Sequence, residues 1–549
     1  MSEFLSKRLN AAPVVAAALF VLATTSSLAA EVQISTAIPD LSADTAPKAM
    51  DGVLELSLED AIQIALERNL GLIVQRYNDA EAQLNLDQTF GMYDLTLTGE
   101  TSTFSETSPS ASNLDGAEVS ITEQLAWNFG LNQLVKSGGT LTLDFNNFRR
   151  ETNSTFSTLN PLYRTDFDLS FSQPLLRGLG TRVTERPILL ARTNLEISHE
   201  TFSQQVTSAI QQVVNAYWTL VETSNQLTVA DRSLDLAKQL HDQNKVRVEV
   251  GTLAPLELVQ SEAGIAIRDE EIIRARAAVA DAEDVLRQLL NLDRTTLWEA
   301  EIKTSTQAEI ERVTVNLGQA IDQALEARPE TVSKRLGLQN LDVDLDFYRN
   351  QKLPQLDFSA RYGLNGLGGP VTERDFFTGE ILFEAPGSYS DALNQITDAS
   401  FEGWSVGLNL TYPIQNRTAE AQLTKAEVAR ERAMAELRDL ELQVATEVRR
   451  AARGLETAGQ QIDSARVSRR LQERTLEAEQ KRYDNGMSTS YRVLEIQRDL
   501  IDAANREVAA VTGYRTALAE FLRSTGSLNE ESGVTIVDPD AAMETAQSE

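Results

Sequence analysis

The chain has 549 residues, 42% of them hydrophobic, and 81 acidic against 50 basic side chains give a formal net charge of −31. A surface this acidic repels phosphates, which argues against a nucleic-acid-binding protein. The sequence contains no cysteine and two histidines, which excludes disulfides and thiolate chemistry and leaves little room for an imidazole metal centre.

The N-terminal residues have the features of an export signal. Lys7 and Arg8 precede an apolar run, 11–23, and the small side chains of Ser27, Ala29 and Ala30 follow. We expect residues 1–29 to be a cleaved signal peptide; a permanent anchor helix is the alternative, but the run is shorter than the roughly 20 residues that a membrane span needs. No other apolar stretch of about 18 residues occurs, so insertion into a membrane would require a closed β-barrel.

An internal repeat organises the rest of the chain. Segments 56–67 and 315–326 share six identities at a constant offset of 259 residues, and in the first copy these are Leu58, Ala61, Ile62, Ala65, Leu66 and Glu67. Both segments carry apolar residues at the spacing of a short amphipathic helix.

Each copy then changes to an alternating pattern that predicts two-faced strands, at 95–98, 141–145, 167–171, 356–362 and 404–412. Half-buried strands of a soluble sandwich show the same alternation. The export signal, the segment length and the aromatic residues at segment ends favour a membrane barrel. We predict a lumen lined by the polar set Thr96, Thr142, Ser405, Asn409 and Thr411. The predicted lipid-facing belt is Trp404, Val406, Leu408, Leu410 and Tyr412.

Long helices are predicted after the last strand of each copy. Pro174 and Pro413 mark these junctions, because proline cannot donate to a β-ladder. Continuous helical patterns then lead to turns at Gly251 and Gly486 and continue for about 40 residues beyond them. Each first helix would reach about 100 Å at 1.5 Å per residue, which suits a tube, a rod or a coiled bundle. Narrow apolar stripes and abundant alanine fit a hollow helical cylinder and equally a two-helix coiled-coil arm.

The two copies differ in length mainly between their strands, where loops tolerate insertions. The longer first copy contains a hairpin candidate around Gly138-Gly139, within 118–148. The pattern leaves open whether this hairpin belongs to the barrel.

At this point the chain resembles the TolC-type family of outer membrane efflux channels, over roughly residues 56–525. The resemblance depends on the repeated helix openings, the strand-to-proline junction at Pro174 and the paired helix-turn-helix segments that begin at Gly251 and Gly486. It implies a mixed α+β membrane channel built from two internal repeats. In such a homotrimer each subunit gives four strands to a transmembrane β-barrel and long helices to a periplasmic α-helical barrel.

The resemblance also implies a periplasmic tip at the two turns, where acidic rings narrow the pore. Glu257 and Glu495 match acidic positions of the family, and Tyr483 matches its tyrosine before the turn. Arg492 stands where some members carry an aspartate, so the pattern does not decide whether these residues form a gate. Solvated surface charges are the alternative interpretation of all of them.

The segments together give a division of the chain into six parts. These are a signal peptide (1–29), an N-terminal extension (30–55), a first repeat with its turn at 251 (56–291), an equatorial linker (292–314), a second repeat with its turn at 486 (315–525) and a disordered acidic tail (526–549).

The predicted function is an outer membrane exit duct of a tripartite efflux or type I secretion system, located in the bacterial outer membrane with a large periplasmic portion. Its expected partners are two further copies, a periplasmic adaptor, an inner-membrane pump and outer membrane lipid. We expect no cofactor, metal or enzymatic activity, because no phosphate loop, HExxH or GxSxG motif occurs. The alternative is a periplasmic coiled-coil adaptor or structural protein without a pore. The sequence does not reveal the cargo or the class of pump.

Overall fold

The computed structural model describes residues 52–534 except 111–117, 293–296, 307–309, 311, 376–377 and 379. The predicted signal peptide, the extension up to residue 51 and the tail from 535 lie outside the described residues. The chain divides into two units, which are described separately. The described residues of 84–192 and 339–431 form one unit, and those of 37–83, 193–338 and 432–549 form the other.

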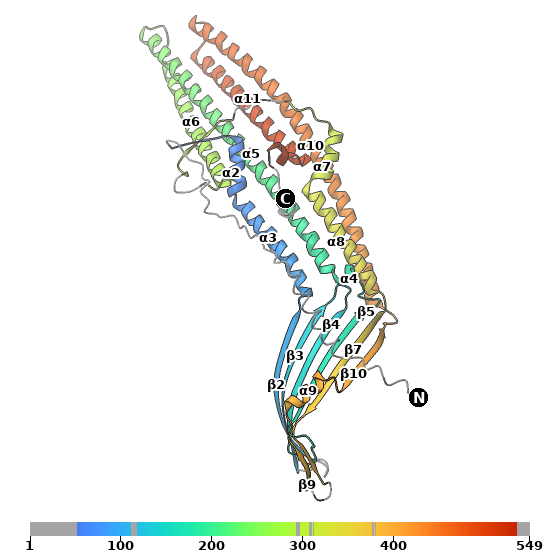
Figure 1. Ribbon diagram of the computed structural model, residues 1–549. Coiled ribbons are helices and arrows are strands. Elements are labelled where there is room, and N and C mark those ends of the chain that lie inside the picture. The colour runs from blue at the N-terminus through green and yellow to red at the C-terminus, as the bar shows by residue number, and fades with distance from the viewer. Residues whose placement is uncertain are drawn as a thin grey trace, which may run out of the picture. The chain divides into compact units, whose positions relative to one another are not determined.

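The first unit contains a six-stranded antiparallel sheet in the order β10-β7-β5-β4-β3-β2 (Figure 1). Its strands are β2 (Thr96–Pro109), β3 (Val119–Leu134), β4 (Thr140–Thr152), β5 (Leu162–Pro174), β7 (Gln355–Gly368) and β10 (Glu402–Thr411). β5 ends at Pro174, and Pro413 follows two residues after the end of β10. The edges of the sheet are β2, from the first copy, and β10, from the second.

The number of strands differs from the expectation of four per subunit. The segment 118–148 contributes β3 and part of β4, which pair with each other and lie within the same sheet. The first copy therefore supplies four strands and the second copy two. The extra hairpin turns at Val135–Gly139, where the Val135 N–H donates to the Gly139 carbonyl over 2.7 Å.

Smaller elements complete this unit. They are the 3-10 turn η1 (Gly91–Tyr93), α4 (Thr181–Thr184), the hairpin strands β8 (Val371–Arg374) and β9 (Ile381–Ala385), and α9 (Tyr389–Thr397). The helix α9 packs against β7 and β5 (Figure 1).

Two short helices open each copy: α2 (Leu58–Arg68) and α3 (Leu70–Phe90), then α7 (Leu317–Ala327) and α8 (Pro329–Gln351). A capping box starts α2, because the Asp60 N–H donates to Ser57 Oγ over 3.1 Å and the Asp60 carboxylate accepts from the Ser57 N–H over 3.2 Å. Asn316 caps α7 in the corresponding place. The repeated sequence pattern thus folds into the same local structure twice.

The second unit contains most of two long helical hairpins, α5 (Arg186–Glu249) with α6 (Pro255–Leu289) and α10 (Arg417–Asp484) with α11 (Ser490–Thr525). The first helices have 64 and 68 residues and the second 35 and 36, which agrees with the lengths that the sequence predicts. No helix in the described part of the chain is long and apolar enough to cross a membrane.

This unit contains three hydrophobic cores: the first lies mainly in the hairpin of α5 and α6, the second mainly in that of α10 and α11, and in the third Leu240 of α5 packs with residues of α10 and α11. Trp218, Leu286 and Leu290 are fully buried in a core that α2 also joins, and Tyr217 donates a hydrogen bond to the Leu56 carbonyl. The second core surrounds the stripe that the sequence predicts on α10, with Val444 and Val448 buried; its other buried members are Ala320, Ala324, Ala451, Leu455, Ala458, Ile462, Tyr514 and Phe521. Burial of one such leucine contributes about 1.5–3 kcal/mol.

Ordered structure also occurs outside the hairpins. The extension and the linker meet in a parallel pair of β1 (Val53–Leu56) with β6 (Glu301–Thr304). The predicted disordered tail begins with α12 (Leu528–Glu531), whose Leu528 is buried in the first core. Disorder from residue 526 is therefore wrong for this part, because Leu528 finds an apolar surface that a single residue in the sequence cannot reveal.

Candidate functional site: a two-faced sheet and the helical tips

The register of the six strands separates the sheet into two chemically different faces. One row of paired positions is apolar throughout: Leu97, Leu131, Leu143, Leu169, Tyr362 and Trp404. The neighbouring row, on the opposite face, consists of Thr98, Gly130, Asp144, Asp168, Gly363 and Gly403. Successive side chains of a strand point to opposite faces, so each strand contributes to both surfaces.

The predicted belt lies on the apolar face. Trp404, Val406, Leu408 and Leu410 alternate along β10 and are 61–75% exposed, and Tyr412 follows directly after the strand. The polar residues predicted to line a lumen lie on the opposite face, since Thr96, Thr142 and Ser405 fall in one row of the register. Asn409 and Thr411 share that face because they alternate with the belt along β10.

Charged residues are rare on the apolar face. In the described strands they are confined to the part of the sheet remote from the two prolines, and they are Glu123, Arg149, Glu151 and Glu402. The rest of this face is apolar or uncharged, so a broad band without charge crosses all six strands.

An aromatic cluster lies on the apolar face beside α9, and sequence reasoning missed it. The rings of Trp127 and Tyr163 lie 5.4 and 6.0 Å from that of Tyr389. The Tyr389 hydroxyl donates to Asn147 Oδ1 over 2.7 Å, and this asparagine is 1% exposed. The helix thus satisfies a buried polar side chain on this largely apolar face. The signal was weak because Tyr389 is separated from its partners by more than 200 residues.

The polar face carries more acidic than basic side chains. The charged residues of this face are Glu100, Glu106, Asp144, Arg150, Arg164, Asp166, Asp168, Asp357 and Arg361. Arg361 holds Asp168 in a bidentate pair, with nitrogen-to-oxygen distances of 2.9 and 2.7 Å. Asp144 lies directly opposite Asp168 in the register, which concentrates negative charge on this face.

The tips of the two helical hairpins have the same local geometry. Gly251 and Gly486 have φ values of +74° and +69°, a conformation that favours glycine. The residue after each glycine donates its N–H to a carbonyl five residues back, from Thr252 to Arg247 over 2.9 Å and from Met487 to Arg482 over 2.8 Å. Such bonds satisfy the free carbonyls at a helix end.

Glu257 connects the two tips. It lies in the first turn of α6, and its Oε2 accepts hydrogen bonds from the side-chain hydroxyl and the backbone N–H of Ser490, the first residue of α11. A carboxylate at a helix N-terminus also interacts favourably with the helix dipole. Glu257 is therefore a structural link as well as a charge.

Tyr483 is the centre of a second link. It is 3% exposed, and its hydroxyl donates to Asn244 Oδ1 of α5. The Arg247 guanidinium lies 4.6 Å from the Tyr483 ring, and donates to the Tyr483 carbonyl over 3.1 Å and to Asp484 over 2.9 Å. Burial raises the pKa of the Tyr483 phenol, so this group remains a hydrogen-bond donor. Sequence reasoning found Tyr483 but not its partners, which belong to the other hairpin.

Glu495 and Arg492 form an exposed ion pair on α11, with 2.5 Å between Arg492 Nη1 and Glu495 Oε2. Their side chains are 43% and 56% exposed. The structure thus joins these two predicted residues to each other, whereas Glu257 and Tyr483 connect the hairpins.

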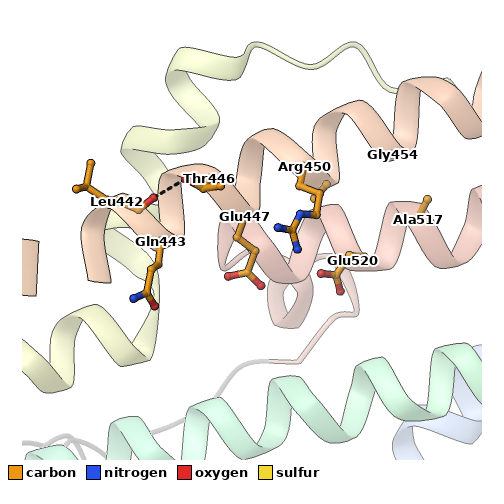
Figure 2. Close-up of a pocket in the computed structure, with 9 residues that line it drawn as sticks. Leu442, Gln443, Thr446, Glu447, Arg450, Gly454, Ala517 and Glu520 are labelled. Atoms are coloured by element: carbon orange, nitrogen blue, oxygen red, sulfur yellow. Dashed lines mark hydrogen bonds between the residues drawn. The ribbon is translucent and has the colours of Figure 1, made fainter. Parts of the chain in front are cut away.

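A groove of about 650 Å³ lies along α10 and α11. Figure 2 shows Glu447, Arg450 and Glu520 on its wall, and Thr446 donating to the Leu442 carbonyl. The Glu447 carboxylate is held by Arg328 and Arg523, and Arg523 also binds Glu520 over 2.9 Å. The carboxylates of this groove are therefore engaged in ion pairs that connect α11 and the C-terminal end of α7 to α10.

Metal ligands are not grouped in the part of the chain that the structure describes: no cluster of three histidine, cysteine, aspartate or glutamate side chains there could hold a metal ion.

Comparisons with known proteins agree with the two-copy organisation. A family model described as outer membrane efflux protein matches residues 140–292 and 320–527, one segment in each copy and together more than half of the chain. No curated protein matches significantly in sequence.

Solved structures of outer membrane channels share the fold at low sequence identity. The Campylobacter jejuni CmeC outer membrane channel is 16% identical, with a TM-score of 0.61, 90% of this chain covered and 89% of that one. The outer membrane protein VceC from Vibrio cholerae is 14% identical, with a TM-score of 0.59 and coverages of 85% and 96%. The open state of the Neisseria gonorrhoeae MtrE outer membrane channel is 16% identical, with a TM-score of 0.58 and coverages of 86% and 89%.

Proposed function

The chain belongs to the family of outer membrane efflux proteins, and we propose that it forms the passive exit duct of a tripartite efflux system. It is an outer membrane protein with a large periplasmic helical portion. The duct would conduct cargo from a pump to the exterior without catalysing a reaction. Type I secretion is the other transport route that such a duct serves.

The observation that carries this proposal is the sheet with one apolar and one polar face. Along β10 the uncharged part of the apolar face runs from Trp404 to Tyr412, about 26 Å at 3.3 Å per residue. A strand tilt of about 40° reduces this to roughly 20 Å, which fits within the apolar band of about 25 Å on outer membrane barrels, and both ends are aromatic, as in the girdles of such barrels. Trp404, Val406, Leu408, Leu410 and Tyr412 would face lipid, and the acidic face would line a wet lumen.

A single sheet with two free edges does not satisfy its backbone in lipid, so the duct requires further copies. We infer a homotrimer whose three sheets close one barrel and whose six hairpins form a periplasmic helical barrel. A periplasmic adaptor and an inner-membrane pump would complete the system. The division of the chain into signal peptide, two repeats, linker and tail fits this assembly.

The helical tips would form the closable periplasmic end. Glu257 and Tyr483 support this role, because each joins the two hairpins beside the turns at Gly251 and Gly486. Opening would have to break the bond from Ser490 to Glu257 and the contacts of Arg247 with Tyr483 and Asp484. Glu495 would add negative charge, partly neutralised by Arg492.

The test is isolation of the full-length protein from outer membrane fractions. We expect a trimer that heating in detergent converts to monomer, and stepwise ion conductance when the trimer is added to planar bilayers. A monomer that does not conduct would overturn the proposal. Release by carbonate extraction of membranes would instead favour a periplasmic adaptor without a pore.

A further inference from the structure

Among the described residues, the two edge strands of the six-stranded sheet have no pairing partner on their outer side. β2 and β10 each have one paired side, and nearly all of their residues are exposed on both faces. Backbone N–H and C=O groups therefore line both edges over 14 and 10 residues. In a membrane these groups need partners, and in water they would promote aggregation.

We propose that β2 of one copy pairs with β10 of the next, so that three six-stranded sheets close a barrel of eighteen strands. This inference rests on the proposed function, because it requires a trimeric barrel. It departs from the twelve strands that four per subunit would give, and it assigns the hairpin of β3 and β4 to the wall of the pore.

The direction of the strands supports this pairing. Every neighbouring pair in the sheet is antiparallel, and the number of strands is even, so β2 and β10 run in opposite directions. An edge of one copy laid beside the other edge of the next copy therefore continues the antiparallel pattern. An odd number of strands would have forced a parallel contact at each seam.

The stagger of the strands supports closure as well. Paired positions lead from Leu97, the second residue of β2, across the sheet to Trp404. Leu97 lies second from the end of its strand where the sheet meets the helices. On β10 the residue second from that same end is Leu410, six residues beyond Trp404. Bringing β2 of the next copy level with this end therefore places Leu97 opposite Leu410.

This register gives a stagger of six residues for six strands, or about one residue per strand. With 3.3 Å per residue and 4.8 Å between strands, the strands tilt by about 35° from the barrel axis. Transmembrane barrels have tilts of about 35–45°. Because the stagger is even, the apolar face of each sheet also continues into the apolar face of the next.

A wider pore follows from the count. Barrel diameter grows roughly in proportion to the number of strands, so eighteen strands enclose a lumen about one and a half times as wide as twelve.

Disulfide trapping tests the seam directly, because the chain contains no cysteine of its own. The proposed register places Thr98 opposite Asn409 on the polar face. Cysteines at directly opposite antiparallel positions can form a disulfide. We expect the double variant Thr98→Cys/Asn409→Cys, oxidised as the assembled trimer, to migrate mostly as covalent dimers and trimers without reductant.

Two control pairs make the result specific. Thr98→Cys/Ser405→Cys lies on the same face but about 13 Å out of register, and it should not link. Thr142→Cys/Asn409→Cys would link only if β4 were the edge of a twelve-stranded barrel, with β2 and β3 outside the wall. Thr98→Cys combined with Gly407→Cys or with Thr411→Cys tests registers shifted by two residues in either direction.

The outcomes separate this inference from the proposed function. Links from Thr98 to Asn409, Gly407 or Thr411 support it. Links from Thr142, or none from Thr98 in a trimer that is intact and conducts ions, overturn the eighteen-stranded barrel and leave the duct standing. A non-conducting monomer overturns both. A cross-section of the purified trimer in single-particle images gives an independent strand count.

Discussion

At the scale of residues, Glu257 combines a charge with a structural bond. Its carboxylate holds the N-terminus of α11 through Ser490, and α11 begins just after the turn at Gly486. The sequence pointed to Glu257 through the family resemblance. It could not point to its partner Ser490, which lies 233 positions away and, as a serine at a helix start, has an ordinary capping role.

Replacing Glu257 separates its two properties. Glu257→Gln keeps an oxygen acceptor for Ser490 and removes the charge, whereas Glu257→Ala removes both. We expect the alanine variant to raise resting conductance in planar bilayers about tenfold, since a lost hydrogen bond to a charged group costs about 1.5 kcal/mol. The glutamine variant should lower cation selectivity and raise resting conductance less than the alanine variant does. Glu495→Gln is the control for the link alone, because Glu495 pairs with Arg492 on its own helix, and its resting conductance should equal that of wild type. Equal resting conductance of wild type and Glu257→Ala would contradict the link.

Glu447 makes the stability of the helical unit depend on pH. Burial alone would raise the pKa of the Glu447 carboxyl, but its hydrogen bonds with Arg328 and Arg523 outweigh burial and hold the pKa below its usual value. A carboxyl with a lowered pKa in the folded state stabilises that state above the unfolded pKa. The contribution is lost as the pH falls through the folded value.

We therefore expect Glu447→Gln to lower the free energy of unfolding by about 1.5–3 kcal/mol at neutral pH. The gap in thermal midpoint between wild type and this variant should narrow below about pH 4.5, the ordinary value for this carboxyl. Circular dichroism of the purified protein measures both midpoints. Glu436→Gln is the control, because Glu436 pairs with Lys334 on the exposed surface. A gap that stays constant down to pH 3 would argue against the assignment.

At the scale of elements, the hairpin turns depend on glycine at two positions. A Cβ at Gly251 or Gly486 would meet no atom within 4 Å, so a substitution there acts through the backbone conformation alone. Gly251→Ala and Gly486→Ala should each cost about 1–2 kcal/mol. Gly513→Ala, inside α11 and equally free of contacts, should instead stabilise by up to about 1 kcal/mol. Thermal loss of helical signal measures all three, and a Gly251→Ala variant as stable as wild type would contradict the role of the turn.

The sequence predicted the long helices well and the strands only in part. Helix lengths followed from the position of glycines and prolines, because both residues constrain the backbone locally. β4, β5, β7 and β10 alternate clearly between apolar and polar residues. β2 was predicted only at 95–98, since beyond Leu97 its apolar-face positions are Gly99, Thr101, Thr103 and Ser105 and the alternation stops. β3 does alternate, but the sequence placed it only within a hairpin candidate of open position, so the count of six strands needed the register.

At the scale of the whole molecule, a small part of the net charge of −31 lies on the polar face of the sheet, whose charged residues sum to −3. Six of the nine charged residues on the polar face of the sheet are acidic, with Asp144 and Asp168 side by side. A water-filled lumen lined in this way would favour cations, and salt would screen the effect.

An acidic lumen predicts that the duct selects cations. We expect Asp144→Asn/Asp166→Asn to lower the ratio of cation to anion permeability, measured by reversal potentials in a salt gradient. The difference from wild type should shrink as ionic strength rises. Glu373→Gln/Glu384→Gln removes the same charge from the β8–β9 hairpin and serves as the control. An unchanged ratio in the first variant would mean that ions are selected elsewhere.

The hairpin turn at Val135–Gly139 has a consequence for how such ducts change in evolution. The chain enters and leaves the antiparallel sheet at the same end, so strands can be added only in pairs. A subunit therefore widens by one hairpin at a time, and a trimer by six strands. Because the addition lies entirely before Pro174, the helices that follow keep the lengths of their counterparts in the other copy. In the proposed barrel, the aperture in the membrane and the reach into the periplasm would thus change independently of each other.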